Sequence, residues 1–215
     1  MKVQATPVGS PEEFNVVIQP MILEGDNLRL VPIYTKQDFE KLYETYSKCP
    51  EVFRWYPDGP ASTLEEFVDL YELFQKDKNR HTFVAYDKNS SPERVIGSVQ
   101  YLDLYPSHKR NEIGSIWIMP EMRGTYALIE MNYLLLFHAF DILKFHRTQW
   151  KTHHENIVSQ KAATKLGFTY EATFKHHIIM YDGTTRNSMF YSVVLEDWPS
   201  VKENLDARLL AFRKQ

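Results

Sequence analysis

The residues whose types and spacing suit chemistry lie in one stretch, residues 112–168. The apolar run Glu112–Ile118 predicts a buried strand, and Arg123 and Gly124 predict a tight turn after it. A long apolar segment, about Thr125–Leu143, then predicts a helix. A short loop between a strand and a helix directs several backbone N–H groups toward one point, and the positive end of the helix dipole adds to them. The turn therefore predicts a phosphate-binding site.

A second strand at Arg147–His153 and a short helix closed by Gly167 complete this unit. Elsewhere, alternating apolar residues and turn signals predict further strands, and a cap at Thr35 and the capping box Ser62-Thr63-Leu64-Glu65 predict two helix starts. Because hairpins and a strand–helix–strand crossover both appear, we expect one mixed α/β sheet in a single domain. The remaining expected strands are Asn15–Leu23, Leu28–Ile33, His81–Asp87, Arg94–Asp103, Thr169–Met180 and Arg186–Leu195, and Trp198–Gln215 is expected to be helical.

Composition narrows the class of protein. The 215 residues are 43% hydrophobic, which is enough to bury a core without disulfides or metals. The formal charge is −3 with acids and bases interspersed, so nucleic acid and anionic membranes are not expected partners. The single cysteine, Cys49, suits a reducing compartment, and the N-terminus lacks the apolar core of a signal peptide. The longest apolar run, around Leu134–Phe137, is too short to cross a bilayer, so we expect a cytoplasmic location.

Two adjacent histidine pairs, His153–His154 and His176–His177, raise the question of a metal site. Neighbouring residues on a strand point to opposite faces, so neither pair is expected to chelate one ion. No cysteine and histidine spacing typical of zinc occurs elsewhere, and we expect no metal.

Eight short motifs occur in an order that resembles the GNAT N-acetyltransferases, in the branch of the RimJ/RimL ribosomal-protein N-terminal acetylases. The resemblance covers Met21 to Trp198. It implies an α/β single-domain GNAT fold, with a mixed, mostly antiparallel sheet, a splayed central strand pair and flanking helices. Residues 1–20 would form an N-terminal arm and residues 199–215 a C-terminal helix. Two prolines, a glycine and charged residues lead us to expect that residues 1–15 of the arm are loose. The motifs are Glu112-Ile113-Gly114, Pro120-Glu121-x-Arg123-Gly124, His138-Ala139-Phe140, His146-Arg147, Asn156-x-x-Ser159, Lys165-Leu166-Gly167-Phe168, Asp182-Gly183-x-x-Arg186-Asn187 and Trp198-Pro199.

The resemblance implies acetyl-CoA as co-substrate and direct attack of a primary amine on its thioester in a ternary complex. Glu112 would act as general base through water, and Ser159 would protonate the leaving sulfur, with Tyr133 and Tyr170 as two other candidates for this acid. Alternatively, Glu112 is an edge glutamate that is solvated or paired with Arg110 or Arg147, and Asn156 is simply a helix cap. The expected CoA contacts are Ile116, Trp117, Ile118, Arg123, Gly124, Thr125, Tyr126, Ala127, Leu128, Asn156 and Ser159.

The acceptor side is less defined by the sequence. The resemblance places Trp55, Tyr56 and His176 in the acceptor pocket, although plain core packing competes for the aromatic residues. A protein N-terminus, a polyamine, an amino acid and an antibiotic all remain open as acceptors, because the fold does not select among them. The acyl group of the donor and the formation of a homodimer are also left open.

One residue departs from the family pattern. After Arg123-Gly124 the pattern continues x-Gly-x-Ala, whereas Tyr126 stands here in place of the second glycine. A side chain at this point could narrow the approach to phosphate or force another backbone conformation. The departure favours an alternative function, a CoA-binding sensor without catalysis, and a protein-interaction domain on the same scaffold is a third.

Overall fold

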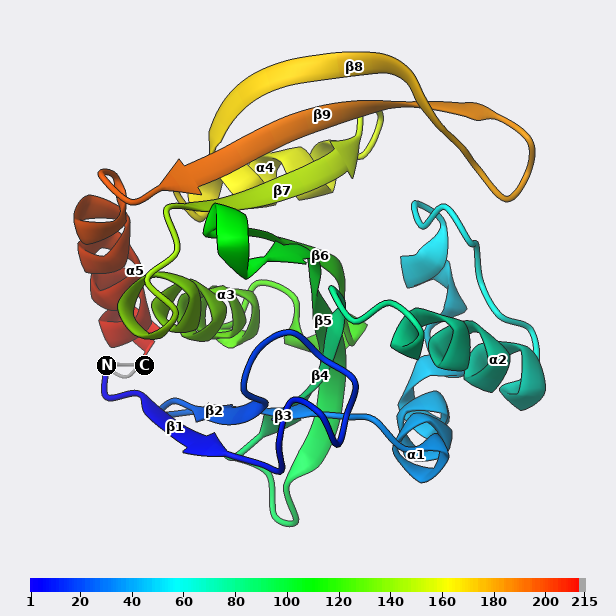
Figure 1. Cartoon of the computed structure of the whole chain (residues 1–215), viewed down its shortest axis with the longest axis horizontal. Helices are drawn as coiled ribbons and strands as arrows, with labels where there is room; N and C mark the ends of the chain where they lie inside the picture. The colour runs from blue at the N-terminus through cyan, green and yellow to red at the C-terminus, as the bar shows by residue number, and fades with distance from the viewer. Residues whose placement is uncertain (213–215) are drawn as a thin grey trace.

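The computed structural model describes residues 1–212, which fold around one nine-stranded sheet (Figure 1). Along the sheet the strands lie in the order β1-β2-β3-β4-β5-β6-β7-β9-β8. All neighbours are antiparallel except β6 and β7, which are parallel. The strands are β1 (Gln4–Pro7), β2 (Met21–Glu24), β3 (Leu28–Pro32), β4 (His81–Asp87), β5 (Arg94–Tyr105), β6 (Arg110–Ile118), β7 (Arg147–His153), β8 (Thr169–Ile179) and β9 (Thr185–Val194).

Helices cover both faces of the sheet and define two hydrophobic cores (Figure 1). The larger core lies under α3 (Ala127–Phe137), α4 (Ile157–Lys165) and α5 (Trp198–Phe212). The smaller core lies under α1 (Lys36–Tyr46) and α2 (Leu64–Gln75), which also contact each other. Apolar residues from both faces of the central strands fill these cores, so the sheet is buried between two helical layers.

Local sequence signals account for most of these elements. Thr35 forms a capping box with Asp38 at the start of α1, and the Thr63 hydroxyl accepts a hydrogen bond from the Glu66 N–H at the start of α2. In β3 the alternate residues Leu28, Leu30 and Pro32 are buried, as the alternation predicts. The predicted α/β class and mostly antiparallel sheet are confirmed.

The two central strands, β6 and β7, separate after a short parallel stretch. They pair only over residues 110–112 and 147–149, although β6 continues to Ile118 and β7 to His153. Opposite β5, strand β6 contains one additional residue, because Gly114 faces Gln100 while Trp117 faces Ser98. Such a bulge bends a strand away from its neighbour. The splayed central pair is therefore confirmed, and the backbone of residues 113–118 has no strand partner on the β7 side.

Two expectations at the N-terminus are corrected. Residues 1–15 are not a loose arm, because β1 pairs antiparallel with β2 and the Met1 ammonium binds Asp206 on α5 at 2.6 Å. The strand expected at Asn15–Leu23 is confined to Met21–Glu24. Asn15 has φ 53°, a left-handed conformation outside regular strand geometry.

The long helix expected at 125–143 is also divided. Regular α3 ends at Phe137, and a single π-helical segment, His138–Ile142, follows. Residues 213–215 of the predicted C-terminal helix lie outside the described residues, and the domain limits at residues 21 and 198 stay predictions.

Candidate active site

The loop between β6 and α3 presents unused backbone donors. Gly124 has φ +76°, and a Cβ there would meet nothing within 4 Å, so the backbone conformation rather than crowding favours glycine. Within the described residues, the N–H groups of Gly124, Thr125, Tyr126 and Leu128 have no protein acceptor. The N–H of Ala127, in contrast, donates to the Thr125 hydroxyl oxygen at 3.2 Å. These free donors at a helix N-terminus suit an anionic group such as a diphosphate.

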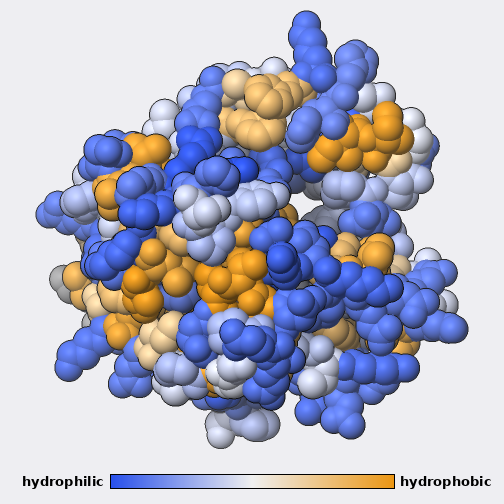
Figure 2. Space-filling view, viewed as in Figure 1, coloured by the Kyte–Doolittle hydropathy of each residue, from blue (hydrophilic) through white to orange (hydrophobic). Residues whose placement is uncertain are grey.

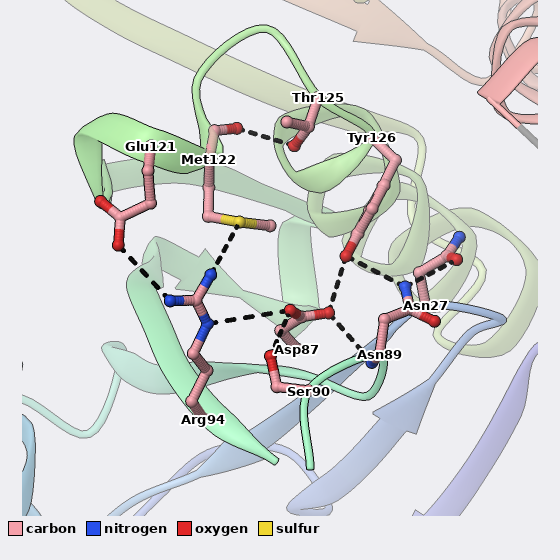
Figure 3. Close-up of polar contacts among 9 residues, drawn as sticks. All are labelled: Asn27, Asp87, Asn89, Ser90, Arg94, Glu121, Met122, Thr125 and Tyr126. Atoms are coloured by element: carbon pink, nitrogen blue, oxygen red, sulfur yellow. Dashed lines mark hydrogen bonds and ion pairs between the residues drawn. The ribbon is translucent and has the colours of Figure 1, made fainter. Parts of the chain in front are cut away.

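Tyr126 does not enter this loop. Figure 3 shows its side chain running from the start of α3 to the β4–β5 turn, away from Thr125. The Tyr126 hydroxyl donates to Asp87 at 2.7 Å and accepts from the Asn89 amide at 3.0 Å. Its backbone is ordinary right-handed, with φ −60°, so the position needs no glycine. The expectation that a side chain here could narrow the site or change the backbone is wrong, and Tyr126 anchors the helix start instead.

Arg123 is the exposed charge of the loop. Its side chain is 55% exposed and its guanidinium lies 3.6 Å from the Glu51 carboxylate. An exposed ion pair of this kind contributes little to stability. The guanidinium is therefore free to exchange Glu51 for an anion at the neighbouring N–H groups.

Glu112 lies at the point where β6 and β7 part. It is only 3% exposed, its carboxylate lies 2.7 Å from the Lys151 ammonium, and it accepts a hydrogen bond from the Gln149 amide at 3.3 Å. Burial raises the pKa of Glu112, and the opposing charge of Lys151 does not fully reverse this effect. Glu112 is therefore neither solvated nor paired with Arg110 or Arg147, the two partners expected if its role were structural.

Lys151 joins Glu112 to a second acid. Its ammonium also lies 2.9 Å from Asp103 on β5. Burial alone would lower the pKa of Lys151, but Glu112 and Asp103 together raise it, so this lysine stays charged. Lys151 is absent from the residues predicted from sequence, since its importance comes from strand pairing and not from any local motif.

Ser159 and Asn156 lie at the start of α4. The Asn156 side chain accepts the Ser159 N–H at 3.1 Å, which confirms the predicted cap. The Ser159 hydroxyl oxygen accepts the Trp150 indole N–H at 3.0 Å, so its own proton remains available. Since Trp150 and Lys151 are neighbours on β7, Ser159 and Glu112 adjoin opposite faces of that strand. Only a ligand passing through the β6–β7 gap would touch both residues.

The two other acid candidates, Tyr133 and Tyr170, differ in environment. Tyr133 is buried and donates to Asp206 on α5 at 3.0 Å, on the α3 side of the larger core. Tyr170 is 49% exposed on β8 and bonds Thr173. Tyr133 therefore has a packing role.

A cavity of about 420 Å³ lies beyond the end of β7. Trp55 and His176, two of the expected acceptor residues, line it. Tyr56 does not, since it packs on Phe53 in the smaller core at 4.9 Å between ring centroids. The other lining residues are Arg54, His153, His154, Glu155, Met180, Tyr181, Asp182, Thr184, Thr185 and Asn187.

His153 and His154 do not diverge, and the prediction that they point to opposite faces is wrong. Their rings stack at 4.6 Å, because β7 ends at His153 and strand alternation does not extend to His154. His176 also departs from the alternation, since its φ is 50° at a bulge in β8. Within residues 1–212, no group of three or more potential metal-binding side chains occurs.

Comparison with known proteins now identifies the class. Residues 27–169 match the family model described as an acetyltransferase (GNAT) domain, and the chain therefore belongs to the GNAT acetyltransferases. Among curated proteins, no match is found.

Solved structures agree over nearly the whole chain. A GCN5-related N-acetyltransferase from Brucella melitensis is 28% identical with a TM-score of 0.81, covering 95% of this chain and 89% of its own. A protein described as an acetyltransferase of T. thermophilus is 30% identical with a TM-score of 0.79, covering 90% of this chain and 100% of its own. A spermidine N-acetyltransferase from Vibrio cholerae, in complex with CoA and spermine, shares the fold at 18% identity and a TM-score of 0.66, covering 81% of this chain and 99% of its own. No helix in the described residues has the length and apolar character needed to span a membrane.

Proposed function

We propose that this GNAT protein is an acyl-CoA-dependent N-acetyltransferase that acetylates a primary amine in a ternary complex. The observation that carries this proposal is the pairing of two features, the free N–H groups after β6 and the gap between β6 and β7. The first suits the diphosphate of CoA, and the second leaves unpaired backbone for its extended arm.

The expected donor contacts follow from this arrangement. Gly124, Thr125, Tyr126 and Leu128 would hold the diphosphate through their N–H groups, with Arg123 adding charge. The side chain of Trp117 is 2% exposed in the smaller core, so residues 116–118 would contact the donor through backbone groups on the open edge of β6. Ala127 would contribute little, because its N–H is already engaged.

Acid–base chemistry would be divided between the two faces of β7. Glu112, whose pKa is raised by burial, would take a proton from the acceptor ammonium directly or through water. The amine nitrogen would then attack the thioester carbonyl, the C–S bond would break, and the Ser159 hydroxyl would protonate the departing sulfur. The Trp150 N–H, which donates to the Ser159 oxygen, favours this direction of proton transfer. The second proton of the attacking nitrogen would be lost as the amide forms and would restore the Ser159 hydroxyl through water.

Tyr126 is the residue that favours the sensor alternative. Its side chain lies outside the loop and leaves the loop open, so the sensor alternative loses this support. The RimJ/RimL branch stays part of the proposal, supported by the ordered motifs. An amine acceptor is consistent with the V. cholerae relative named as a spermidine N-acetyltransferase.

Thiol release from acetyl-CoA, measured with peptides, polyamines and amino acids as acceptors, tests the proposal. We expect release that depends on an amine and that falls steeply in Glu112→Gln. Glu121→Gln, which alters an exposed glutamate paired with Arg94, is the matched control and should retain activity. If calorimetry detects no acetyl-CoA binding at about millimolar concentration, the proposal is rejected.

A further inference from the structure

Arg186 on β9 is a buried cation without a direct partner. Its exposed fraction is 7%, and its Nε is buried without a hydrogen-bond acceptor. Among residues 1–212, no side chain or carbonyl forms a hydrogen bond or ion pair with its guanidinium. Of the five N–H donors of this guanidinium, the one on Nε is buried and unmet, which is costly. An acceptor on a bound ligand would satisfy it.

Strand register places Arg186 on the face that holds the proposed base. On β9, Ser188 is opposite His153 and Phe190 is opposite Lys151. Because side chains alternate along a strand, Arg186 projects to the same face as these residues. Lys151 contacts Glu112 on that face, so Arg186 lies further along the same surface, toward the hairpin tip.

The acid nearest in effect to Arg186 is already paired with another residue. Burial lowers its pKa, and the charge of Glu112 opposes this effect. Glu112, however, is held by Lys151 at 2.7 Å, and Lys151 is shared with Asp103 at 2.9 Å. Burial lowers the pKa of His153, and the neighbouring His154 and the charge of Arg186 add to this effect.

The cavity beside this surface offers room for a ligand. Thr185 and Asn187, the chain neighbours of Arg186, line the 420 Å³ cavity together with His153. Figure 2 shows the surface hollowed between the β8–β9 hairpin and the helical lobe of α1 and α2. Arg186 itself does not line the cavity, but its charge acts on the pKa of His153, which does, so a ligand in the cavity would lie close to Arg186.

We infer that the acceptor of this enzyme carries a carboxylate a few bonds from its reactive amine, and that Arg186 binds this carboxylate. The inference rests on the proposed function and names its acceptor class. The planar guanidinium matches a carboxylate with two parallel hydrogen bonds, while the amine would approach Glu112. A polyamine has no group that Arg186 could bind and would place a second cation next to it, which is unfavourable.

Matched acceptors test this inference. Glycine, β-alanine, 4-aminobutyrate and 6-aminohexanoate are each compared with their primary amides, and spermidine is included. We expect the best carboxylate to exceed its amide by about 10- to 100-fold in binding and in kcat/KM, the range for hydrogen bonds to a charged group. If the amides or spermidine equal or exceed the carboxylates with the wild-type protein, the inference is overturned.

Variants of Arg186 give the second arm. Arg186→Gln should remove the preference for the carboxylate, chiefly through KM. It should also melt no lower than wild type, because a buried charge without a partner is removed. Lys175→Gln, which removes an exposed charge on β8, is the control and should keep the preference. Equal losses for carboxylate and amide in Arg186→Gln would contradict the inference.

Binding measured by calorimetry separates this inference from the proposed function. Should carboxylates bind, and lose binding in Arg186→Gln, while no acyl transfer is seen, the Arg186 site stands and the acetyltransferase proposal fails. Should transfer occur with equal rates to carboxylates and amides, the acetyltransferase proposal stands and the Arg186 inference fails. If Arg186→Gln does not fold, Arg186→Lys replaces it, and the wild-type preference still decides.

Discussion

Two buried glutamates on either side of the same strand–helix unit have opposite surroundings. Glu130 in α3 is fully buried and accepts three hydrogen bonds, from the Asn27 backbone and amide at 2.7 Å and from the Leu28 N–H at 2.9 Å. Glu112 in β6 is almost equally buried, but it is held by one lysine and one long hydrogen bond beside an open gap. Burial alone therefore does not distinguish a structural acid from a reactive one. The number of fixed donors does, because a carboxylate whose oxygens are all engaged by the fold has no free position for a substrate proton.

The sharpest test of this comparison is Glu112→Gln. If Glu112 is the base, we expect kcat to fall about 10³-fold, within the range for loss of a positioned general base. Acetyl-CoA affinity should stay within a few fold, since Gln preserves the shape. Steady-state thiol release and calorimetry measure the two quantities, and an unchanged kcat would assign the base to another group.

Glu130→Gln should have the opposite outcome. The amide cannot accept all three hydrogen bonds, so buried donors in the β2–β3 turn lose their acceptor. We expect the free energy of unfolding to fall by about 3 kcal/mol, as measured by urea denaturation at pH 7. The folded fraction should keep its kcat, and a loss of kcat with unchanged stability would reverse the roles of the two acids.

Low pH should destabilise the fold through two buried histidines and not through Glu112 or Glu130. His81 and His138 are each 1% exposed, and burial lowers their pKa to about 3 and about 4. As the pH falls below 6.5, the ordinary histidine pKa, the unfolded chain takes up protons that the folded protein cannot bind. Their contribution to stability is present above pH 6.5 and is lost as the pH falls toward 4.

Between pH 7 and pH 5.5 we therefore expect the two histidines to lower the free energy of unfolding by about 2.5 kcal/mol. Urea denaturation at both pH values measures this loss. In His138→Gln the loss should be about half as large. Equal stability of the wild-type protein at the two pH values would show that these rings are not held neutral.

The smallest effect is expected for Tyr126→Phe. The change removes hydrogen bonds to Asp87 and Asn89, and we expect a loss of about 1–2 kcal/mol in the free energy of unfolding. Acetyl-CoA affinity should change less than threefold, because the side chain lies outside the loop. A tenfold change in the affinity for acetyl-CoA would show that the Tyr126 side chain contributes to acetyl-CoA binding.

The sequence predicts what depends on local periodicity and capping. The strand Arg147–His153 has the predicted limits, and Thr35 and Asn156 cap as expected, because these features arise from neighbours within a few residues. Strand β1 escapes prediction because its residues are mostly exposed and it is stabilised by pairing with β2. The π-helical segment after Phe137 likewise has no local signal.

Within the site, sequence order identifies Glu112 and the loop after β6 but not the partners that define their roles. Lys151, Glu130 and Arg186 acquire their meaning from strand register and helix packing. These bring Lys151 to Asp103, 48 positions away, and Glu130 to Asn27, 103 positions away. For Arg186 the sequence does carry a signal. Arg186, Ser188 and Phe190 are alternate residues of one strand, so their side chains must project to the same face.

CoA binding at the N–H groups after β6, and in the gap beside it, is the central claim. Titration of acetyl-CoA into the protein, followed by the backbone amide resonances, tests this most directly. The largest shifts are predicted for Gly124, Thr125, Tyr126 and Leu128, with further shifts along residues 116–118. Saturating acetyl-CoA that leaves these resonances in place would contradict the claim.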